Sequence, residues 1–78
     1  GRYDVMLIPR QKNQLAFVLE FKVYDAQEEL KLEDTVQSAL AQIEEKDYDT
    51  ELVERGISKL QIRHYGFAFE GKKVLIGE

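Results

Sequence analysis

The chain has 78 residues, of which 44% are hydrophobic and 33% are charged, and its formal net charge is −4. This length predicts one domain over residues 1–78 with a small core, and the absence of cysteine excludes disulfides and thiolate metal sites. The lone His64 cannot form a zinc site by itself. Apolar runs are far shorter than the roughly 20 residues needed to cross a bilayer, so we expect a cytoplasmic protein with no membrane partner.

Charge is distributed unevenly along the sequence. Residues 26–54 carry ten acidic and two basic side chains, whereas the remainder carries nine basic and five acidic ones. The acidic block is interpreted mainly as a solvated helix face. The net acidity argues against a basic protein that wraps nucleic acid. The basic residues are concentrated in the expected strands, however, so local contacts between these strands and nucleic acid stay an alternative.

The first elements in chain order are two expected strands. Residues 2–10 alternate, with Tyr3, Val5 and Leu7 on one face and Asp4, Met6 and Ile8 on the other. The polar residues 11–13 predict a hairpin loop. Residues 14–24 form the second expected strand, and its apolar side chains on both faces are typical of a strand that is covered on both sides.

A long helix is expected next. Asp25-x-x-Glu28 resembles a capping box and predicts a helix over residues 26–46. Its buried stripe follows helical spacing and comprises Leu32, Val36, Ala39, Leu40 and Ile43. Thr35, Ala39 and Gln42 line the edge of this stripe.

The remaining elements are a second, short helix from Asp49 to Arg55, ended by Gly56, and two strands near residues 59–69 and 72–77. Glu70-Gly71 predicts the turn between these strands. The order predicts an α+β fold, in which one long helix crosses a small mixed or antiparallel sheet.

Three charged side chains interrupt the apolar pattern of the expected hairpin. If residues 11–13 form the loop, Asp4 lies opposite Glu20 and Arg2 lies opposite Lys22, so Asp4, Glu20 and Lys22 share one face. Two opposed carboxylates destabilise a sheet by up to roughly 1 kcal/mol, which a divalent cation such as Mg²⁺ would offset. On this argument, Asp4→Asn should stabilise the metal-free protein. The alternative is a structural salt-bridge cluster in which Lys22 pairs with Glu20 or Asp4.

Four segments together resemble a known family. They are "GRYD", "EFK", "SALAQI" and "YGFAFEGKKVLIG", and in this order they resemble the PD-(D/E)XK nuclease superfamily. More narrowly, they resemble its bacterial branch found at the C-termini of AAA-ATPase-like proteins. The resemblance implies a restriction-endonuclease-like core, Mg²⁺ or Mn²⁺ as cofactor, and an ATPase-like domain in the full-length protein. The family core usually begins with a helix before the strand that bears Asp4, so we expect that first helix to be missing here.

The resemblance also implies roles for individual residues. Asp4 and Glu20 match metal ligands, together with the backbone carbonyl of Phe21, and Lys22 matches the catalytic lysine. Gln42 matches a helix glutamine that approaches the site, although an ordinary boundary glutamine is the alternative. Tyr48 matches an aromatic residue after the helix, for which we expect a packing role.

Two functions from different classes are therefore carried forward. The first is a metal-dependent nuclease that hydrolyses phosphodiester bonds, with DNA as the favoured substrate. The second is a nuclease-like dimerisation or docking module with little or no catalysis. Phosphate contacts are proposed for Arg2, Arg10, Lys12, Arg63, Lys72 and Lys73, each of which also fits a solvated surface residue. One helix cannot cover all the apolar strand residues, so we expect a homodimer.

Overall fold

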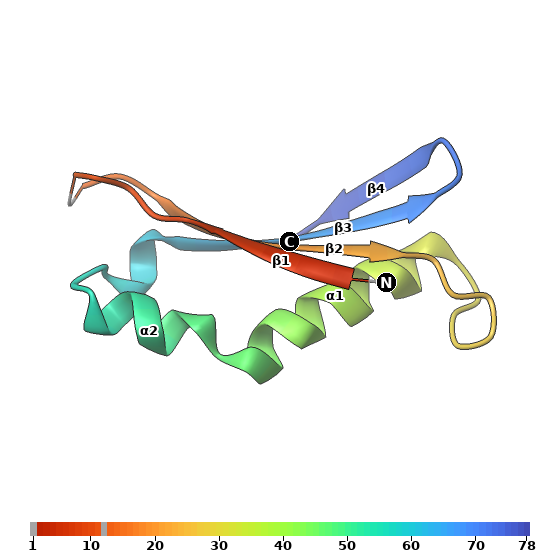
Figure 1. The fold of residues 1–78 in the computed structure, drawn as a ribbon, viewed down its shortest axis with the longest axis horizontal. Helices are drawn as coiled ribbons and strands as arrows, with labels where there is room; N and C mark the ends of the chain where they lie inside the picture. Colours follow the sequence, from red (N-terminus) through yellow and green to blue (C-terminus); the bar gives the residue numbers. More distant parts are fainter. Residues whose placement is uncertain (1, 12) are drawn as a thin grey trace.

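The computed structural model describes residues 2–11 and 13–78. In chain order the elements are β1 (Arg2–Leu7), β2 (Ala16–Val23), α1 (Leu32–Lys46), α2 (Tyr48–Glu54), the short 3₁₀ helix η1 (Lys59–Gln61), β3 (Ile62–Glu70) and β4 (Lys73–Gly77). The four strands form one sheet in the order β1-β2-β3-β4 (Figure 1). This arrangement confirms the predicted α+β fold and is consistent with a restriction-endonuclease-like core.

The sheet is mixed. β1 and β4 run antiparallel to their neighbours, whereas β2 and β3 are parallel. A parallel pair requires a crossover connection, and α1 and α2 supply it. Both helices lie on the same side of the sheet (Figure 1), so one face of the sheet is covered and the other is open. None of the helices in the described part of the chain is long and apolar enough to cross a membrane.

The predicted hairpin register is confirmed. Asp4 pairs with Glu20, and Arg2 pairs with Lys22. The strands are shorter than expected, because the ladder ends at the pair Leu7 and Phe17. The connection is therefore longer than residues 11–13, and Lys12 lies outside the described residues.

The core lies between the sheet and the helices. It is a cluster of buried residues contributed by β2, β3 and both helices: Ala16, Val18, Ile43, Leu52 and Ile62. Ile62 pairs with Ala16 and is buried with it in this cluster.

The start of α1 and the turn between β3 and β4 also differ from expectation. α1 begins at Leu32 rather than at residue 26, because the main chain at Asp25 forms a turn that accepts hydrogen bonds from the N–H groups of Glu28 and Glu29. Asp34 caps the helix instead, since its Oδ2 accepts from the backbone N–H of Lys31 at 3.2 Å. The last hairpin turn is Gly71-Lys72 rather than Glu70-Gly71, and Gly71 has a φ of 59°, which favours glycine.

Gly66 allows α1 to approach β3 closely. A Cβ at this position would lie 2.9 Å from the carbonyl oxygen of Val36 and 3.2 Å from the Cβ of Ala39. Gly66 pairs with Glu20 on β2, so the helix approaches the sheet closely over the row that contains Glu20 and Asp4.

We expect Gly66→Ala to push α1 away from this row. Because the obstructing atom belongs to the backbone, the new methyl group should cost about 1–3 kcal/mol of unfolding free energy. For a domain of this size each kcal/mol corresponds to about 4–8 °C in Tm, which thermal unfolding followed by circular dichroism would detect. An unchanged Tm would contradict the close approach.

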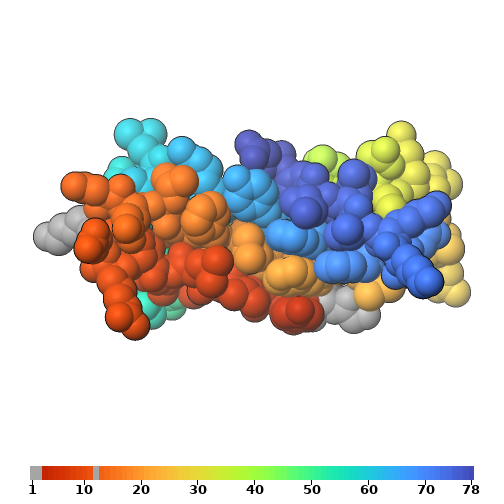
Figure 2. All heavy atoms as spheres, turned by 90° about the horizontal axis from the view of Figure 1, so that it is seen from above, coloured from red at the N-terminus to blue at the C-terminus, as the bar shows by residue number. Residues whose placement is uncertain are grey.

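The open face of the sheet is rich in aromatic side chains. The ring of Phe21 stacks between Tyr3 and Phe67, with centroid distances of 4.8 Å to each. Tyr3 is 63% exposed, and Ile76 at the other end of the same cross-strand row is 53% exposed. Figure 2 shows this face, on which all four strands are visible.

Candidate active site

The charged residues of the hairpin lie on the covered face of the sheet. The alternation of β2 places Glu20 and Lys22 on the same side as the core residues Ala16 and Val18, and all four are buried. Asp4 shares this side because it lies directly opposite Glu20. The predicted convergence of the three side chains on one face is therefore confirmed.

Asp4 is held by two residues at the junction of α1 and α2. Its Oδ2 accepts a hydrogen bond from Nζ of Lys46 at 2.6 Å and another from the hydroxyl of Tyr48. These contacts, that of Lys46 first, hold the pKa of Asp4 below its usual value. In turn, the Asp4 carboxylate raises the pKa values of Lys46 and Tyr48. Tyr48 was expected to pack, and it also donates this hydrogen bond.

Glu20 is fully buried between the hairpin and α1. The charge of Lys46 reaches Glu20 as well as Asp4, and both carboxylates contribute to the raised pKa of Lys46. Lys46 therefore offsets part of the repulsion between Asp4 and Glu20 that we expected a divalent cation to offset. For this reason the expectation that Asp4→Asn stabilises the metal-free protein is revised.

Asp4→Asn should now destabilise the metal-free protein at pH 7 by about 1–2 kcal/mol, because it weakens two charge-assisted hydrogen bonds of a partly exposed group. The folded-state pKa of Asp4 lies below the ordinary value of 3.8, so this contribution is present above that pH and is lost as the pH falls through the folded-state pKa. Urea unfolding in EDTA, at pH 7 and in steps toward pH 3, measures both effects. A variant that is more stable than the wild type at pH 7 would restore the original repulsion argument.

Lys22 has an ion-pair partner from outside the hairpin. Its ammonium forms a buried ion pair with Glu29, in which the two side chains are 10% and 6% exposed. Glu29 lies in the connection between β2 and α1, which folds back under the sheet. The proposed salt-bridge cluster thus exists in a different form, with a carboxylate from outside the hairpin.

Gln42 lies half-buried on α1. It shares one helix face with Thr35, Ala39 and Lys46, which are spaced four, three and four residues apart. This face passes over the row of Gly66 and Glu20 and reaches Asp4 through Lys46. The position is compatible with the role implied for Gln42, which stays a prediction.

Oxygen donors of the kind that Mg²⁺ and Mn²⁺ prefer are present on this face. Asp4 and Glu20 supply two carboxylates, and the carbonyl of Phe21 follows directly in the chain. A carboxylate has two oxygens, so the contacts at Oδ2 of Asp4 are compatible with a metal at its other oxygen. Among residues 2–11 and 13–78, no group of three or more His, Asp or Glu side chains is arranged to hold a metal ion. Water or substrate oxygens would have to complete the coordination.

Three of the proposed phosphate contacts lie at the two ends of the molecule. Arg10 lies in the β1–β2 connection, and Lys72 and Lys73 lie at the β3–β4 turn, at opposite ends of the molecule (Figure 1). The guanidinium of Arg63 donates to the carbonyl oxygen of Leu60 at 2.8 Å. Of the other two candidates, Arg2 lies in β1 and Lys12 is outside the described residues.

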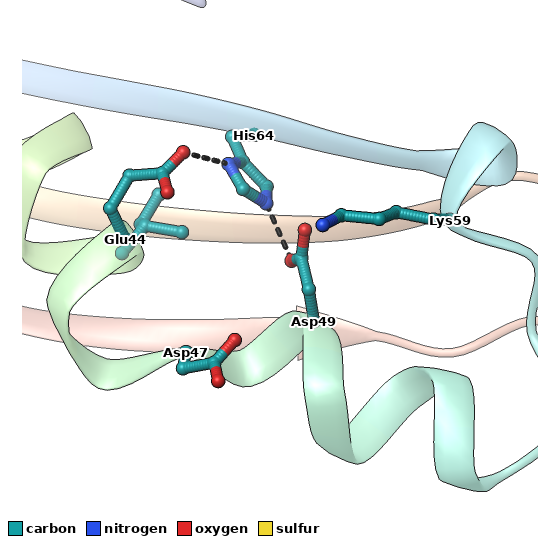
Figure 3. A pocket seen from close by; sticks show the side chains of 6 residues that line it. Glu44, Asp47, Asp49, Lys59 and His64 are labelled. Atoms are coloured by element: carbon teal, nitrogen blue, oxygen red, sulfur yellow. Dashed lines mark hydrogen bonds and ion pairs between the residues drawn. The ribbon is translucent and has the colours of Figure 1, made fainter.

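A second polar cluster surrounds His64 (Figure 3). Its Nε2 lies 2.6 Å from Oδ1 of Asp49, and its Nδ1 lies 3.9 Å from Oε1 of Glu44. Asp47 and Lys59 line the same small pocket. Because His64 pairs with Val18 on β2, this cluster lies two residues along the sheet from the row of Glu20.

Sequence reasoning missed three residues that contact the site. Lys46 continues the helical spacing of Thr35, Ala39 and Gln42, and this signal was sufficient to find it. Thr35 was placed on the edge of the stripe without a partner. No sequence pattern distinguished Glu29 from Glu28 and the other acidic residues around it.

The family model of the PD-(D/E)XK nuclease superfamily matches residues 1–78. The chain therefore belongs to this superfamily, as the resemblance of its motifs had indicated. No curated protein and no solved structure matches the chain.

Proposed function

We propose that this chain is the core of a metal-dependent nuclease that hydrolyses phosphodiester bonds. The observation that carries the proposal is the opposed pair Asp4 and Glu20, with Lys22 on the same covered face, in a chain of the PD-(D/E)XK superfamily. Such a set combines oxygen ligands with a cation close to them.

Each residue has a distinct role in this proposal. Asp4, Glu20 and the carbonyl of Phe21 hold Mg²⁺ or Mn²⁺, which when bound lowers the pKa of a water molecule and screens phosphoryl charge. Lys22 orients the attacking water or a scissile phosphate oxygen through its N–H groups. The water gives up a proton to solvent as its oxygen bonds to phosphorus, the ester P–O bond breaks, and the leaving oxygen takes a proton from solvent. Gln42 approaches the same site from α1.

DNA is the favoured substrate, and the cytoplasm is the proposed location. Arg10 and Lys73 are exposed and would contact phosphates far from the reacting bond, which positions a strand without reading its sequence. The full-length protein would carry an ATPase-like domain, as the narrower bacterial branch does.

The test is a cleavage assay on supercoiled plasmid, linear duplex DNA and RNA, with Mg²⁺, Mn²⁺ or EDTA. We expect cleavage of DNA that requires a divalent ion and is lost in Asp4→Ala. A calorimetric Mn²⁺ titration of the same two proteins should give binding only for the wild type. Cleavage that persists in EDTA, or in Asp4→Ala, would contradict this site.

The second candidate, a docking module without catalysis, is favoured by a different observation. The ammonium of Lys22 and Oδ2 of Asp4 are both engaged by other residues of the chain, so the cluster can be stable without metal. The Mn²⁺ titration separates the two candidates, because a docking module has no need to bind the ion.

We further propose that the open face is covered by a second copy of the chain in a two-fold symmetric dimer. The aromatic row from Tyr3 to Ile76 would form the centre of the contact. Light scattering at micromolar concentrations should give twice the chain mass of 9.1 kDa, and Tyr3→Lys with Ile76→Lys should give a monomer. A wild-type monomer across this range would refute the dimer and leave the metal site untouched.

A further inference from the structure

The ion-pair partner of Lys22 is held from several directions. Oε2 of Glu29 contacts Nζ of Lys22, while Oε1 accepts from Oγ1 of Thr35 at 2.9 Å and from the backbone N–H of Asp25 at 2.9 Å. The backbone carbonyl of Glu29 accepts from the hydroxyl of Tyr24 at 3.0 Å. Both oxygens of the carboxylate and the main chain of the same residue are therefore fixed.

These contacts hold the pKa of Glu29 below its usual value, although it is buried. Burial alone would raise the pKa, but the hydrogen bonds from Lys22, Asp25 and Thr35 outweigh it. The groups that hold Glu29 come from the end of β2, from the connection that follows it and from the first turn of α1. The turn at Asp25 that delays the start of α1 also places Glu29 beneath Lys22.

A buried ion pair is weak evidence for a role in stability, because desolvation offsets much of the attraction. The pair does, however, fix the position of the ammonium. The lysine ammonium sits at the end of a flexible four-carbon stem. Without a fixed partner, the charge would therefore sample many positions. An ammonium also has three N–H donors, so one bond to Glu29 is compatible with further bonds to water or phosphate.

We propose that Glu29, itself fixed by Thr35 and the N–H of Asp25, is the positioning residue for Lys22. The assignment rests on the proposed nuclease function for its catalytic meaning. Glu29 acts through Lys22 and is not a metal ligand, because both of its oxygens are occupied by donors of the chain. Thr35 acts one step further away, through Glu29.

The position of the ammonium is tested first without any cleavage. In protein labelled with ¹⁵N at lysine Nζ, the Lys22 ammonium should give a signal protected from rapid hydrogen exchange, identified by its loss in Lys22→Arg. Glu29→Gln should abolish or shift this signal, whereas the control Glu28→Gln, the same change at the exposed neighbouring residue, should leave it unchanged. A Lys22 signal that is the same in Glu29→Gln and the wild type would overturn the proposal.

Kinetics give the second readout. Glu29→Gln should lower kcat for DNA cleavage by about 10–100-fold, as loss of a supporting hydrogen-bond partner does, with KM and Mn²⁺ affinity within about twofold of the wild type. Thr35→Val should have a smaller effect in the same direction. Weakened Mn²⁺ binding in Glu29→Gln would make Glu29 a ligand and overturn the assignment, as would an unchanged kcat.

The two proposals fail in different ways. If the wild type binds no Mn²⁺ and cleaves no DNA, the nuclease function is wrong, and the lysine spectra alone decide whether Glu29 holds Lys22. If the wild type cleaves and Glu29→Gln is equally active with an unchanged Lys22 signal, the nuclease function stands and the role of Glu29 is wrong.

Discussion

Replacing Lys22 by Met together with Glu29 by Gln is expected to reduce Mg²⁺-dependent DNA cleavage by at least about 100-fold, while the protein remains folded. Removing both charges avoids leaving either one buried alone, because each is the partner of the other. Met keeps most of the length of the lysine stem, and Gln keeps acceptor and donor groups for Thr35. The loss would therefore report on the ammonium itself rather than on unfolding.

The matched control is Lys31→Met with Glu28→Gln. It makes the same two changes in the connection between β2 and α1, where both side chains are exposed, and it should cleave as the wild type does. Circular dichroism and Tm establish that both double variants are folded. Wild-type cleavage by the Lys22 and Glu29 variant would indicate a contaminating nuclease or a different site.

Lys22→Ala alone is expected to behave differently, with a loss of about 3–5 kcal/mol of unfolding free energy at pH 7. It leaves the Glu29 carboxylate buried without its cation. Such a loss is a large fraction of the stability of a small domain, so a simple alanine variant confounds catalysis with folding.

The cost of Lys22→Ala should shrink in acid. The folded-state pKa of Glu29 lies below its ordinary value of 4.5, so its ion pair stabilises the wild type above that pH. This contribution is lost as the pH falls through the folded-state pKa. In the variant a protonated Glu29 is also easier to bury. Urea unfolding of both proteins from pH 7 to pH 3 measures the difference, with Lys31→Ala as control, and a constant difference would contradict the role of Glu29.

The hairpin could be predicted from the sequence because its register depends on local features. The alternation of β1 and β2 and the polar residues between them were sufficient to place Asp4 opposite Glu20. The predicted loop between β1 and β2 was too short. The register was still correct, because lengthening an antiparallel loop equally on both sides leaves the pairing unchanged. Two of the four family motifs, "GRYD" and "EFK", lie in the same hairpin and pointed to the same face.

The partners of these residues could not be predicted in the same way. Lys46 and Tyr48 are more than 40 positions from Asp4 in the chain, and only the docking of α1 brings them together. The start of α1 was misjudged because Asp25-x-x-Glu28 satisfies a helix-capping pattern, whereas Glu29 gains more from its buried contacts with Lys22 and Thr35. Local propensity was thus overridden by a tertiary contact, as often occurs at helix ends.

The parallel pairing of β2 with β3 affects how quickly the molecule can form. Ala16 pairs with Ile62, so the central ladder closes only after the intervening chain has been ordered, and pairings of high sequence separation slow folding. The hairpin of β1 and β2 is local and can form early. At that stage the carboxylates of Asp4 and Glu20 would face each other without the positive charge of Lys46. We therefore expect the hairpin alone to be unstable, and the complete set of charges to assemble in the same late step that docks α1 on the sheet.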